Sequence, residues 1–237
     1  MLGTAFSWKV AAMKRISDEK LIKVQIRDNS EKFVNLRKFC PEIIVKIELE
    51  SRALQHLKKD ECYVRKTVAI KLCAAQKTLQ KGLKLLVLDG YRSIEAQRKM
   101  HEHFCRQLKR RHPKWSEKKI LSFADLFVAN PDKITLHSTG GVVDLTICDS
   151  KGRQFDMGSE IYLFPENLSA PKKISAIARK NRALLKRCLE KQGFVNYPLE
   201  WWHWSYGDAY WAAALKKRHA IYAPASVEKA MPARRKK

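Results

Sequence analysis

The segment GVVDLTIC, residues 141–148, places one carboxylate, Asp144, inside a mostly apolar run. This alternation predicts a β-strand with two opposite faces, one with Val142, Asp144 and Thr146 and the other with Val143, Leu145 and Ile147. An unpaired carboxylate in the interior of a protein is energetically expensive. We therefore expect a fold that brings a partner for Asp144, such as a metal ion, to the middle of a strand.

Two histidines lie at spacings that suit a metal site with Asp144. His137 precedes Asp144 by seven residues, and Gly140 and Gly141 lie between them. Glycines let the backbone turn sharply, so a loop imidazole and a strand carboxylate can converge on one ion. His203 lies further along, in LEWWHWS. Two imidazoles and one carboxylate leave one corner of a tetrahedral zinc ion open, which is typical of catalytic zinc sites.

Two further residues suit hydrolytic chemistry. Glu200 lies three positions before His203, and metal-assisted hydrolysis needs a group that takes a proton from water. Arg92 follows a predicted buried strand and turn, and arginine is suited to an oxyanion or a carboxylate. The simpler interpretation of Glu200 and His203 is a charged residue and a histidine that lie beside core tryptophans. The simpler interpretation of Arg92 is a turn arginine in a surface ion pair. Together, the signals favour a zinc hydrolase.

Hydrophobic periodicity predicts an α+β fold. We expect a single domain with a small, mainly antiparallel sheet that carries the zinc site and is flanked by helices. Strands are expected at 41–49, 83–90 and 141–148, with a strand and turn in FVNYPLEWWHWSY. Helices are expected at about 64–81 and 94–110, and from Pro171 to just before Gly193. The inward side chains of that last helix should be Ile174, Ile177, Leu184, Leu185 and Cys188.

The ends of the chain differ in composition from its middle. We expect residues 1–20 to be a loose leader, 21–222 to form the catalytic domain, and 223–237 to be a disordered basic tail. No apolar run approaches the roughly 18 residues that a membrane span requires. The six cysteines form no C-x-x-C pair, which excludes a zinc ribbon and favours reduced thiols. We therefore expect a cytoplasmic protein, with a periplasmic location as the alternative.

Charge and motif content limit the other function classes. Lys and Arg outnumber Asp and Glu by 48 to 24, a net charge of +24, which favours weak association with polyanions through a basic surface. Much of this charge lies in residues 106–119 and in the tail VEKAMPARRKK, but no specific nucleic acid partner is indicated. No serine-hydrolase elbow or phosphate-binding glycine loop is present. Four other histidines are expected to be solvent-exposed, namely His101, His103, His112 and His219.

Three motifs in order resemble those of the D-alanyl-D-alanine dipeptidases. They are DGYR at 89–92, T-x-H-x-x-G-x-V-x-D at 135–144 and EWWHW at 200–204. The dipeptidases are VanX-type zinc metallopeptidases, related to the D,D-carboxypeptidases and more distantly to the hedgehog fold. The resemblance extends over about residues 33–205.

The resemblance implies one Zn²⁺ per chain, with His137, Asp144 and His203 as its ligands. It also implies that Glu200 is the general base for the zinc-bound water and that Arg92 stabilises the oxyanion. The substrate would be the D-alanyl-D-alanine dipeptide or a related cell-wall peptide.

The chain departs from the family pattern at the substrate positions. Thr135 replaces the motif serine, and Tyr162 stands where the dipeptidases carry the acid that binds the substrate ammonium group. Glu160 lies two positions earlier and can replace that acid. Thr135, Glu160 and Tyr162 are therefore the candidate substrate-binding residues. One alternative is a D,D-carboxypeptidase or endopeptidase that acts on longer peptidoglycan peptides. A second is a non-catalytic basic binding protein on a metallopeptidase scaffold, although such a module would not need Glu200.

Overall fold

The structure is a computed structural model that describes residues 16–47, 61–125, 128–159 and 174–230. A five-stranded mixed sheet lies at its centre, in the order β2-β4-β5-β7-β6. Its strands are β2 (Ile44–Val45), β4 (Leu83–Asp89), β5 (Val142–Asp149), β7 (His203–Ser205) and β6 (Val195–Asn196). β2 runs parallel to β4 and every other neighbouring pair is antiparallel. The α+β class and the mainly antiparallel sheet are confirmed.

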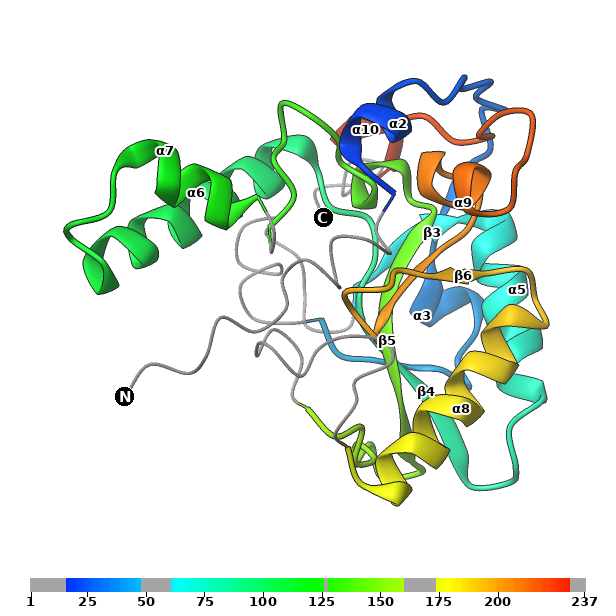
Figure 1. Ribbon diagram of the computed structural model, residues 1–237. Helices are drawn as coiled ribbons and strands as arrows, with labels where there is room; N and C mark the ends of the chain where they lie inside the picture. The colour runs from blue at the N-terminus through cyan, green and yellow to red at the C-terminus, as the bar shows by residue number, and fades with distance from the viewer. Residues whose placement is uncertain (1–15, 48–60, 126–127, 160–173, 231–237) are drawn as a thin grey trace, which may run out of the picture.

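Two helices cover one face of this sheet, α5 (Lys66–Lys77) and α8 (Ala176–Glu190), and Figure 1 shows them side by side. The main core includes Leu72 of α5, Leu185 of α8, and Val143, Leu145 and Ile147 of β5. Since side chains alternate along a strand, Val142, Asp144 and Thr146 point to the opposite face. The predicted division of β5 into two faces is thus confirmed, and Asp144 points away from the main core.

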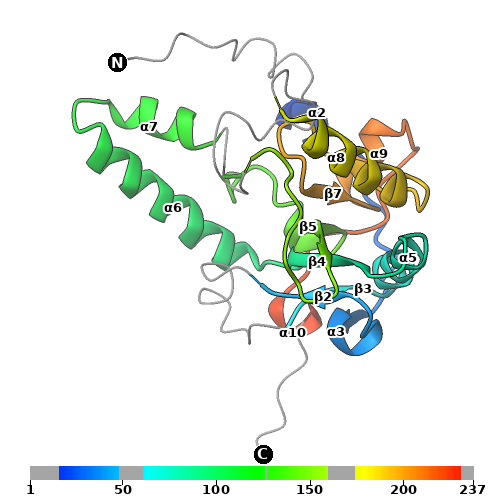
Figure 2. The same cartoon turned by 90° about the horizontal axis from the view of Figure 1, so that it is seen from below.

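The smaller elements lie around the ends of the sheet. A two-stranded antiparallel sheet pairs β1 (Phe33–Asn35) with β3 (Tyr63–Arg65). The short helices are α2 (Asp18–Ile22), α3 (Leu36–Phe39), α9 (Ala209–Ala214) and α10 (Val227–Ala230), and η1 (His137–Thr139) is a 3₁₀ turn. The helices α6 (Ile94–Arg111) and α7 (Glu117–Ala124) form a hairpin that extends away from the sheet in Figures 1 and 2.

Several predicted boundaries differ from those of the structure. Only Ile44 and Val45 of the predicted strand 41–49 pair with β4, and residues 48–49 lie outside the described residues. Helix α8 begins at Ala176 because the Ser175 side chain accepts a hydrogen bond from Ala178 N. Pro171 also lies outside the described residues.

The predicted inner face of α8 is partly wrong. Ile177 is 66% exposed, whereas Arg182 is buried. The inner face contains Ala178, Arg182, Leu185, Cys188 and Leu189. It is therefore rotated from the predicted face and includes a charged residue.

The predicted tail begins too early. Ala225 and Ala230 are buried, and the Tyr91 hydroxyl donates a hydrogen bond to Ala225 O at 2.9 Å. Ala225 N also donates to Ser138 O. Backbone hydrogen bonds and small side chains thus hold residues 223–230 against the domain. Among the described ranges, the structure contains no helix with the length and apolar character of a transmembrane span.

Candidate metal centre

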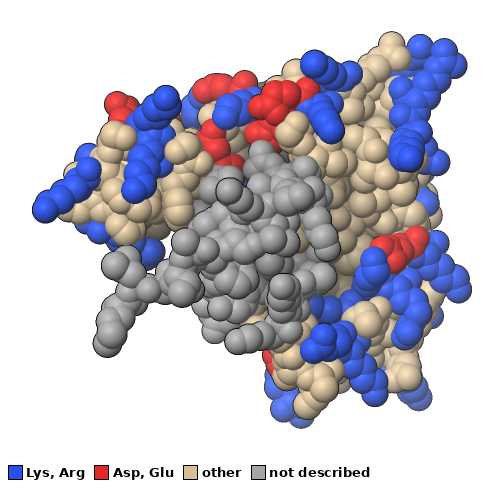
Figure 3. All heavy atoms as spheres, viewed as in Figure 1, with Lys and Arg blue, Asp and Glu red and all other residues tan. Residues whose placement is uncertain are grey.

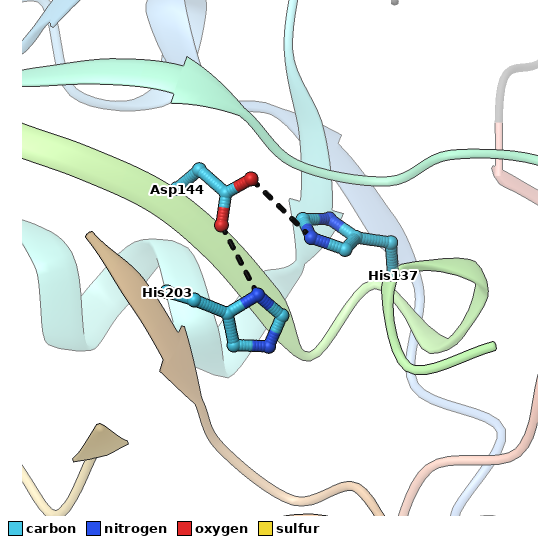
Figure 4. A group of neighbouring side chains, drawn as sticks. All are labelled: His137, Asp144 and His203. Carbon is cyan, nitrogen blue, oxygen red and sulfur yellow. Dashed lines mark ion pairs between the residues drawn. The ribbon is translucent and has the colours of Figure 1, made fainter. Parts of the chain in front are cut away.

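Two elements that are adjacent in the sequence and a third, distant one bring His137, Asp144 and His203 together (Figure 4). His137 begins η1, Asp144 lies on β5 and His203 lies on β7. The antiparallel register pairs Asp144 directly with His203. Side chains of directly paired residues lie on the same face of a sheet, so the register aligns these two donors.

The turn between His137 and β5 depends on Gly140. This residue has φ 71°, in the left-handed region that glycine adopts readily. A Cβ atom there would also lie 2.1 Å from the Phe33 ring. Glycine is therefore required both by the backbone conformation and by the close packing of Phe33. The turn expected from the sequence at Gly140 is present.

The donor atoms of the three residues converge. His137 Nε2 lies 3.4 Å from Asp144 Oδ2, and His203 Nδ1 lies 3.2 Å from Asp144 Oδ1. One ligand atom from each residue lies within 4.8 Å of the others, and all three residues are buried. Two imidazole nitrogens and a carboxylate oxygen form a donor set that zinc prefers. The arrangement therefore fits a metal ion.

A hydrogen bond orients the His137 ring. Its Nδ1 lies 2.8 Å from the carbonyl oxygen of Gly90. Because a carbonyl can only accept, Nδ1 carries a proton, and Nε2 is the ring nitrogen left available to a metal ion. Such outer hydrogen bonds fix the tautomer and orientation of histidines that bind metals.

The electrostatics of the centre favour an ionised Asp144. Burial alone would raise the pKa of Asp144, but the adjacent His137 and His203 outweigh it and hold that pKa far below its usual range. The site thus presents a negative charge between two imidazoles, as a divalent cation requires.

Glu200 lies at the edge of the same centre. Its Oε2 is 3.4 Å from His203 Nδ1, and its side chain is only 17% exposed. Burial raises the pKa of Glu200 to about 7, and Asp144 adds to this effect, whereas His203 and Arg92 oppose it. The structure thus places the carboxylate of Glu200 beside the donor atoms, where it can exchange a proton.

Arg92 is buried rather than placed in a surface ion pair. Its Nε and Nη2 donate to Asp89 Oδ2 at 3.2 and 2.5 Å, and its Nη1 donates to Gln97 Oε1 at 2.8 Å. Its backbone N–H donates to His137 O. The guanidinium is therefore held in one orientation next to the histidine turn.

The predicted substrate-binding residues are only partly described. The Thr135 hydroxyl is buried and lies 2.7 Å from Ser138 Oγ, within the turn before His137. Glu160 and Tyr162 lie outside the described residues. The described segment that leads to them ends at Ser159.

Arg65 supports the site and was not predicted from the sequence. It is fully buried, and its Nε donates to Thr139 O at 2.8 Å. Nη1 donates to Glu31 O at 2.7 Å, and Nη2 donates to Ala223 O at 3.0 Å. One side chain thus connects the histidine turn to two distant segments. An arginine between the apolar residues of YVRKTV was the available signal.

Arg182 is a second residue that the sequence analysis missed. Its Nε donates to Met157 O at 2.6 Å and its Nη2 donates to Ser159 Oγ at 3.2 Å. Trp201 Nε1 donates to the same Ser159 hydroxyl at 3.0 Å. Arg182 therefore links α8 to the 156–159 segment and to the residue that follows Glu200.

The expectation that His101 is solvent-exposed is wrong. His101 is buried, and its Nε2 lies 2.8 Å from Asp125 Oδ1. The reason is that α7 folds back along α6 and covers it. His112 is exposed as expected, whereas His103 and His219 are partly buried.

Comparison with known proteins agrees with the three motifs. The model of the D-ala-D-ala dipeptidase family matches residues 47–224. A D-alanyl-D-alanine dipeptidase of Synechocystis sp. is 31% identical over 184 residues, which covers 66% of this chain and 74% of the relative. A D-alanyl-D-alanine dipeptidase of Escherichia coli is 29% identical over 137 residues, which covers 54% of this chain and 58% of the relative.

A solved structure, VanYB in complex with D-Alanine-D-Alanine, aligns with a TM-score of 0.44 and 17% identity. That alignment covers 67% of this chain and 78% of VanYB. The family match alone spans most of the sequence, including the centre built by His137, Asp144 and His203. The chain therefore belongs to the D-Ala-D-Ala dipeptidase family of metallopeptidases.

Proposed function

We propose that the protein is a zinc-dependent dipeptidase that hydrolyses D-alanyl-D-alanine to two D-alanines. The observation that carries this proposal is the position of a fourth side chain, Glu200, beside the three converging donors. The Glu200 carboxylate lies 3.4 Å from the same His203 nitrogen that faces Asp144. A purely structural metal site would not need this additional acid. The names of the relatives from Synechocystis sp. and Escherichia coli support the choice of substrate.

His137, Asp144 and His203 would hold one zinc ion through Nε2, a carboxylate oxygen and Nδ1. A zinc ion held there supplies Lewis-acid chemistry, which lowers the pKa of water and polarises a carbonyl group. The chain itself supplies the orientation. The bond from His137 Nδ1 to Gly90 O and the pairing of β5 with β7 fix the donors before an ion binds.

Glu200 is the proposed general base. Its carboxylate takes a proton from the attacking water and later delivers it to the departing amine of the second D-alanine. Its position beside His203 supports this role, because a base must lie within reach of the proton that it removes.

Arg92 is the proposed oxyanion-stabilising residue. Hydrogen bonds to Asp89 and Gln97 hold its guanidinium in one orientation, and its positive charge partly opposes the burial that raises the pKa of Glu200. A positive group that is already oriented stabilises the developing oxyanion without reorganisation. We further propose that Thr135, Glu160 and Tyr162 contact the substrate, and that Glu160 supplies the negative charge that binds the substrate ammonium group.

The proposal is tested by incubating the purified, zinc-loaded protein with D-Ala-D-Ala and measuring the release of D-alanine. We expect release from D-Ala-D-Ala, none from L-Ala-L-Ala, and loss of release when a chelator is added. A muramyl pentapeptide that ends in D-Ala-D-Ala is the comparison substrate. Release from the pentapeptide but not from the dipeptide would replace the proposal with a D,D-carboxypeptidase.

A further inference from the structure

The hairpin of α6 and α7 has its own small core and extends from the body of the protein (Figures 1 and 2). Leu108, Ile120 and Ala124 form its small buried core, and Phe104, Cys105, Trp115 and Phe123 pack against this core. The His101–Asp125 contact and the Lys133–Asp125 ion pair, both at atom separations below 3 Å, secure its base. The metal centre uses none of this unit beyond the first turns of α6.

The outer end of the hairpin is strongly basic. We define the hairpin tip as residues 109–119, which contain six Lys or Arg residues and one acid, Glu117. Figure 3 shows Lys and Arg atoms gathered on this projecting part of the surface. Arg110, Arg111, Lys114 and Lys118 are exposed, and none of them forms an ion pair with a described residue.

The cations of α6 that lie closer to the body are neutralised. Arg98 pairs with Asp132 at 2.8 Å, Lys99 with Glu95 at 2.7 Å, and Arg106 with Glu102 at 3.9 Å. The uncompensated charge is therefore concentrated at the tip and does not form a stripe along the helix. A projecting charged tip suits a flat anionic surface, whereas a linear polyanion needs an extended groove or stripe.

The aromatic side chain of the tip is already engaged. The His112 ring stacks on Trp115 with ring centroids 4.0 Å apart and an angle of 8° between the planes. Lys119 Nζ lies 4.3 Å from the Trp115 ring centroid, and Phe123 meets the ring edge-on at 5.3 Å. Proteins that hold single-stranded nucleic acid use aromatic rings on which bases stack. Trp115 is occupied within the tip and does not provide such a ring.

We propose that the hairpin tip binds peripherally to the surface of a bilayer that contains anionic phospholipid. Leu121 on α7 is exposed, but no large apolar side chain of the tip itself, residues 109–119, is among the exposed ones in the described part of the chain. The contact is therefore electrostatic and does not require insertion. Basic residues near an anionic membrane surface are attracted over about one Debye length, and salt weakens the attraction. The inference is independent of the dipeptidase proposal, since it uses a different surface.

The test is co-sedimentation of the full chain with vesicles of phosphatidylcholine alone or mixed with phosphatidylglycerol. We expect binding only to the mixed vesicles at low salt, and release as salt rises. The variant Arg110→Gln/Arg111→Gln/Lys114→Gln should bind about 100-fold more weakly, since each cation at such a surface strengthens binding roughly fivefold.

A matched control removes the same charge from another surface. Lys180, Arg187 and Lys191 are exposed on or just after α8 and form no ion pair with a described residue. The variant Lys180→Gln/Arg187→Gln/Lys191→Gln should bind mixed vesicles within about threefold of the unmodified chain, because it changes only the long-range attraction between the net charge of the chain and the membrane. Circular dichroism checks the fold of both variants. If the tip variant unfolds, Lys114→Glu, in the turn between the helices, replaces it and should weaken binding by about tenfold or more.

Three outcomes would overturn the proposal. One is an equal loss of binding in the two triple variants, which would mean that net charge alone acts. The second is no difference between the two kinds of vesicle. The third is tighter binding to a DNA duplex than to mixed vesicles at equal salt, abolished by the tip variant, which would assign the tip to nucleic acid.

Discussion

The Nδ1 atom of His137 lies 2.8 Å from the carbonyl oxygen of Gly90, which joins the histidine turn to the end of β4. Gly90 can serve this role because it lies closely against β3. A Cβ atom at Gly90 would lie 2.5 Å from Cys62 Sγ and 3.0 Å from Tyr63 O. The glycine of the DGYR motif thus lets β4 approach β3, and its carbonyl then fixes the ring that faces Asp144.

Replacing His203 tests the metal centre directly. His203→Ala removes one of three converging donors, and we expect zinc affinity to fall by more than about 100-fold, since outer hydrogen bonds alone contribute 10- to 100-fold. His112→Ala, an exposed histidine on the hairpin, is the matched control and should leave the zinc content unchanged. Elemental analysis after dialysis measures both. Equal zinc content in the two variants would remove His203 from the centre.

Glu200→Gln separates catalysis from metal binding. The amide keeps the shape of the side chain but cannot take a proton, so kcat for D-Ala-D-Ala should fall by about 10²- to 10⁴-fold. Zinc content should stay at one ion per chain, because Glu200 lies beside the donors and is not one of them. Glu190→Gln, on the exposed side of α8, is the control. Unchanged turnover in Glu200→Gln would exclude Glu200 as the base.

The central strands and the face of Asp144 could be predicted because they depend on local alternation. Most residues of β4 and β5 are buried. Val143, Leu145 and Ile147 of β5 lie in the main core, and Asp144 is on the opposite face, as the alternation predicts. The pairing of Asp144 with His203 could not be predicted in this way, since it depends on a register between residues 59 positions apart, as 203 − 144 gives. The sequence indicated Asp144 and His203 as ligands of one ion, but not the register that pairs them.

The errors have physical causes that a hydrophobic pattern does not record. Arg182 was not assigned to the inner face of α8 because arginine is rarely buried, yet carbonyl and hydroxyl oxygens satisfy it there. Residues 223–230 bind through backbone groups and small alanine side chains, which give little periodic signal. His101 became buried only because α7 returns along α6.

Arg65 should contribute strongly to stability. Three carbonyl oxygens, those of Glu31, Thr139 and Ala223, accept from its guanidinium. Lysine cannot reproduce this planar set of donors, so Arg65→Lys should lower the free energy of unfolding by roughly 3 kcal/mol through unsatisfied buried carbonyls. Denaturant titration measures this change. The exposed Arg37→Lys should change the same free energy by less than about 0.5 kcal/mol, and similar losses in both variants would contradict the role of Arg65.

Asp28 should make stability depend on pH at the acid end. Burial opposes its ionisation, but hydrogen bonds from Lys229 and Ala223 N and the charge of Arg65 outweigh burial and lower the pKa of Asp28 below 3.8. A lowered pKa stabilises the fold above the unfolded value, and this contribution is lost as the pH falls through the folded value.

The measurement for Asp28 compares thermal midpoints of the unmodified chain and Asp28→Asn across the acid range. The unmodified chain should be the more stable above about pH 4, and the difference should shrink as the pH falls further. Glu190→Asn, at an exposed α8 position, is the control. A difference that grows toward lower pH would contradict the assignment.

Arg182 should act as a positioning residue for substrate. It holds Met157 O and the Ser159 hydroxyl, and Trp201 Nε1 shares that hydroxyl. Small misplacements near a site can reduce turnover by up to about 10²-fold, so Arg182→Gln should lower kcat/KM for D-Ala-D-Ala by roughly 10- to 100-fold. Because the segment leads toward Glu160, the larger share of this loss should be in KM.

Arg182→Lys, which keeps the charge, should recover part of the loss in kcat/KM, whereas zinc content should be unchanged in both Arg182 variants. Arg179→Gln, exposed on the same helix, provides the comparison. Kinetics equal to those of Arg179→Gln would limit Arg182 to a structural role without effect on the substrate segment.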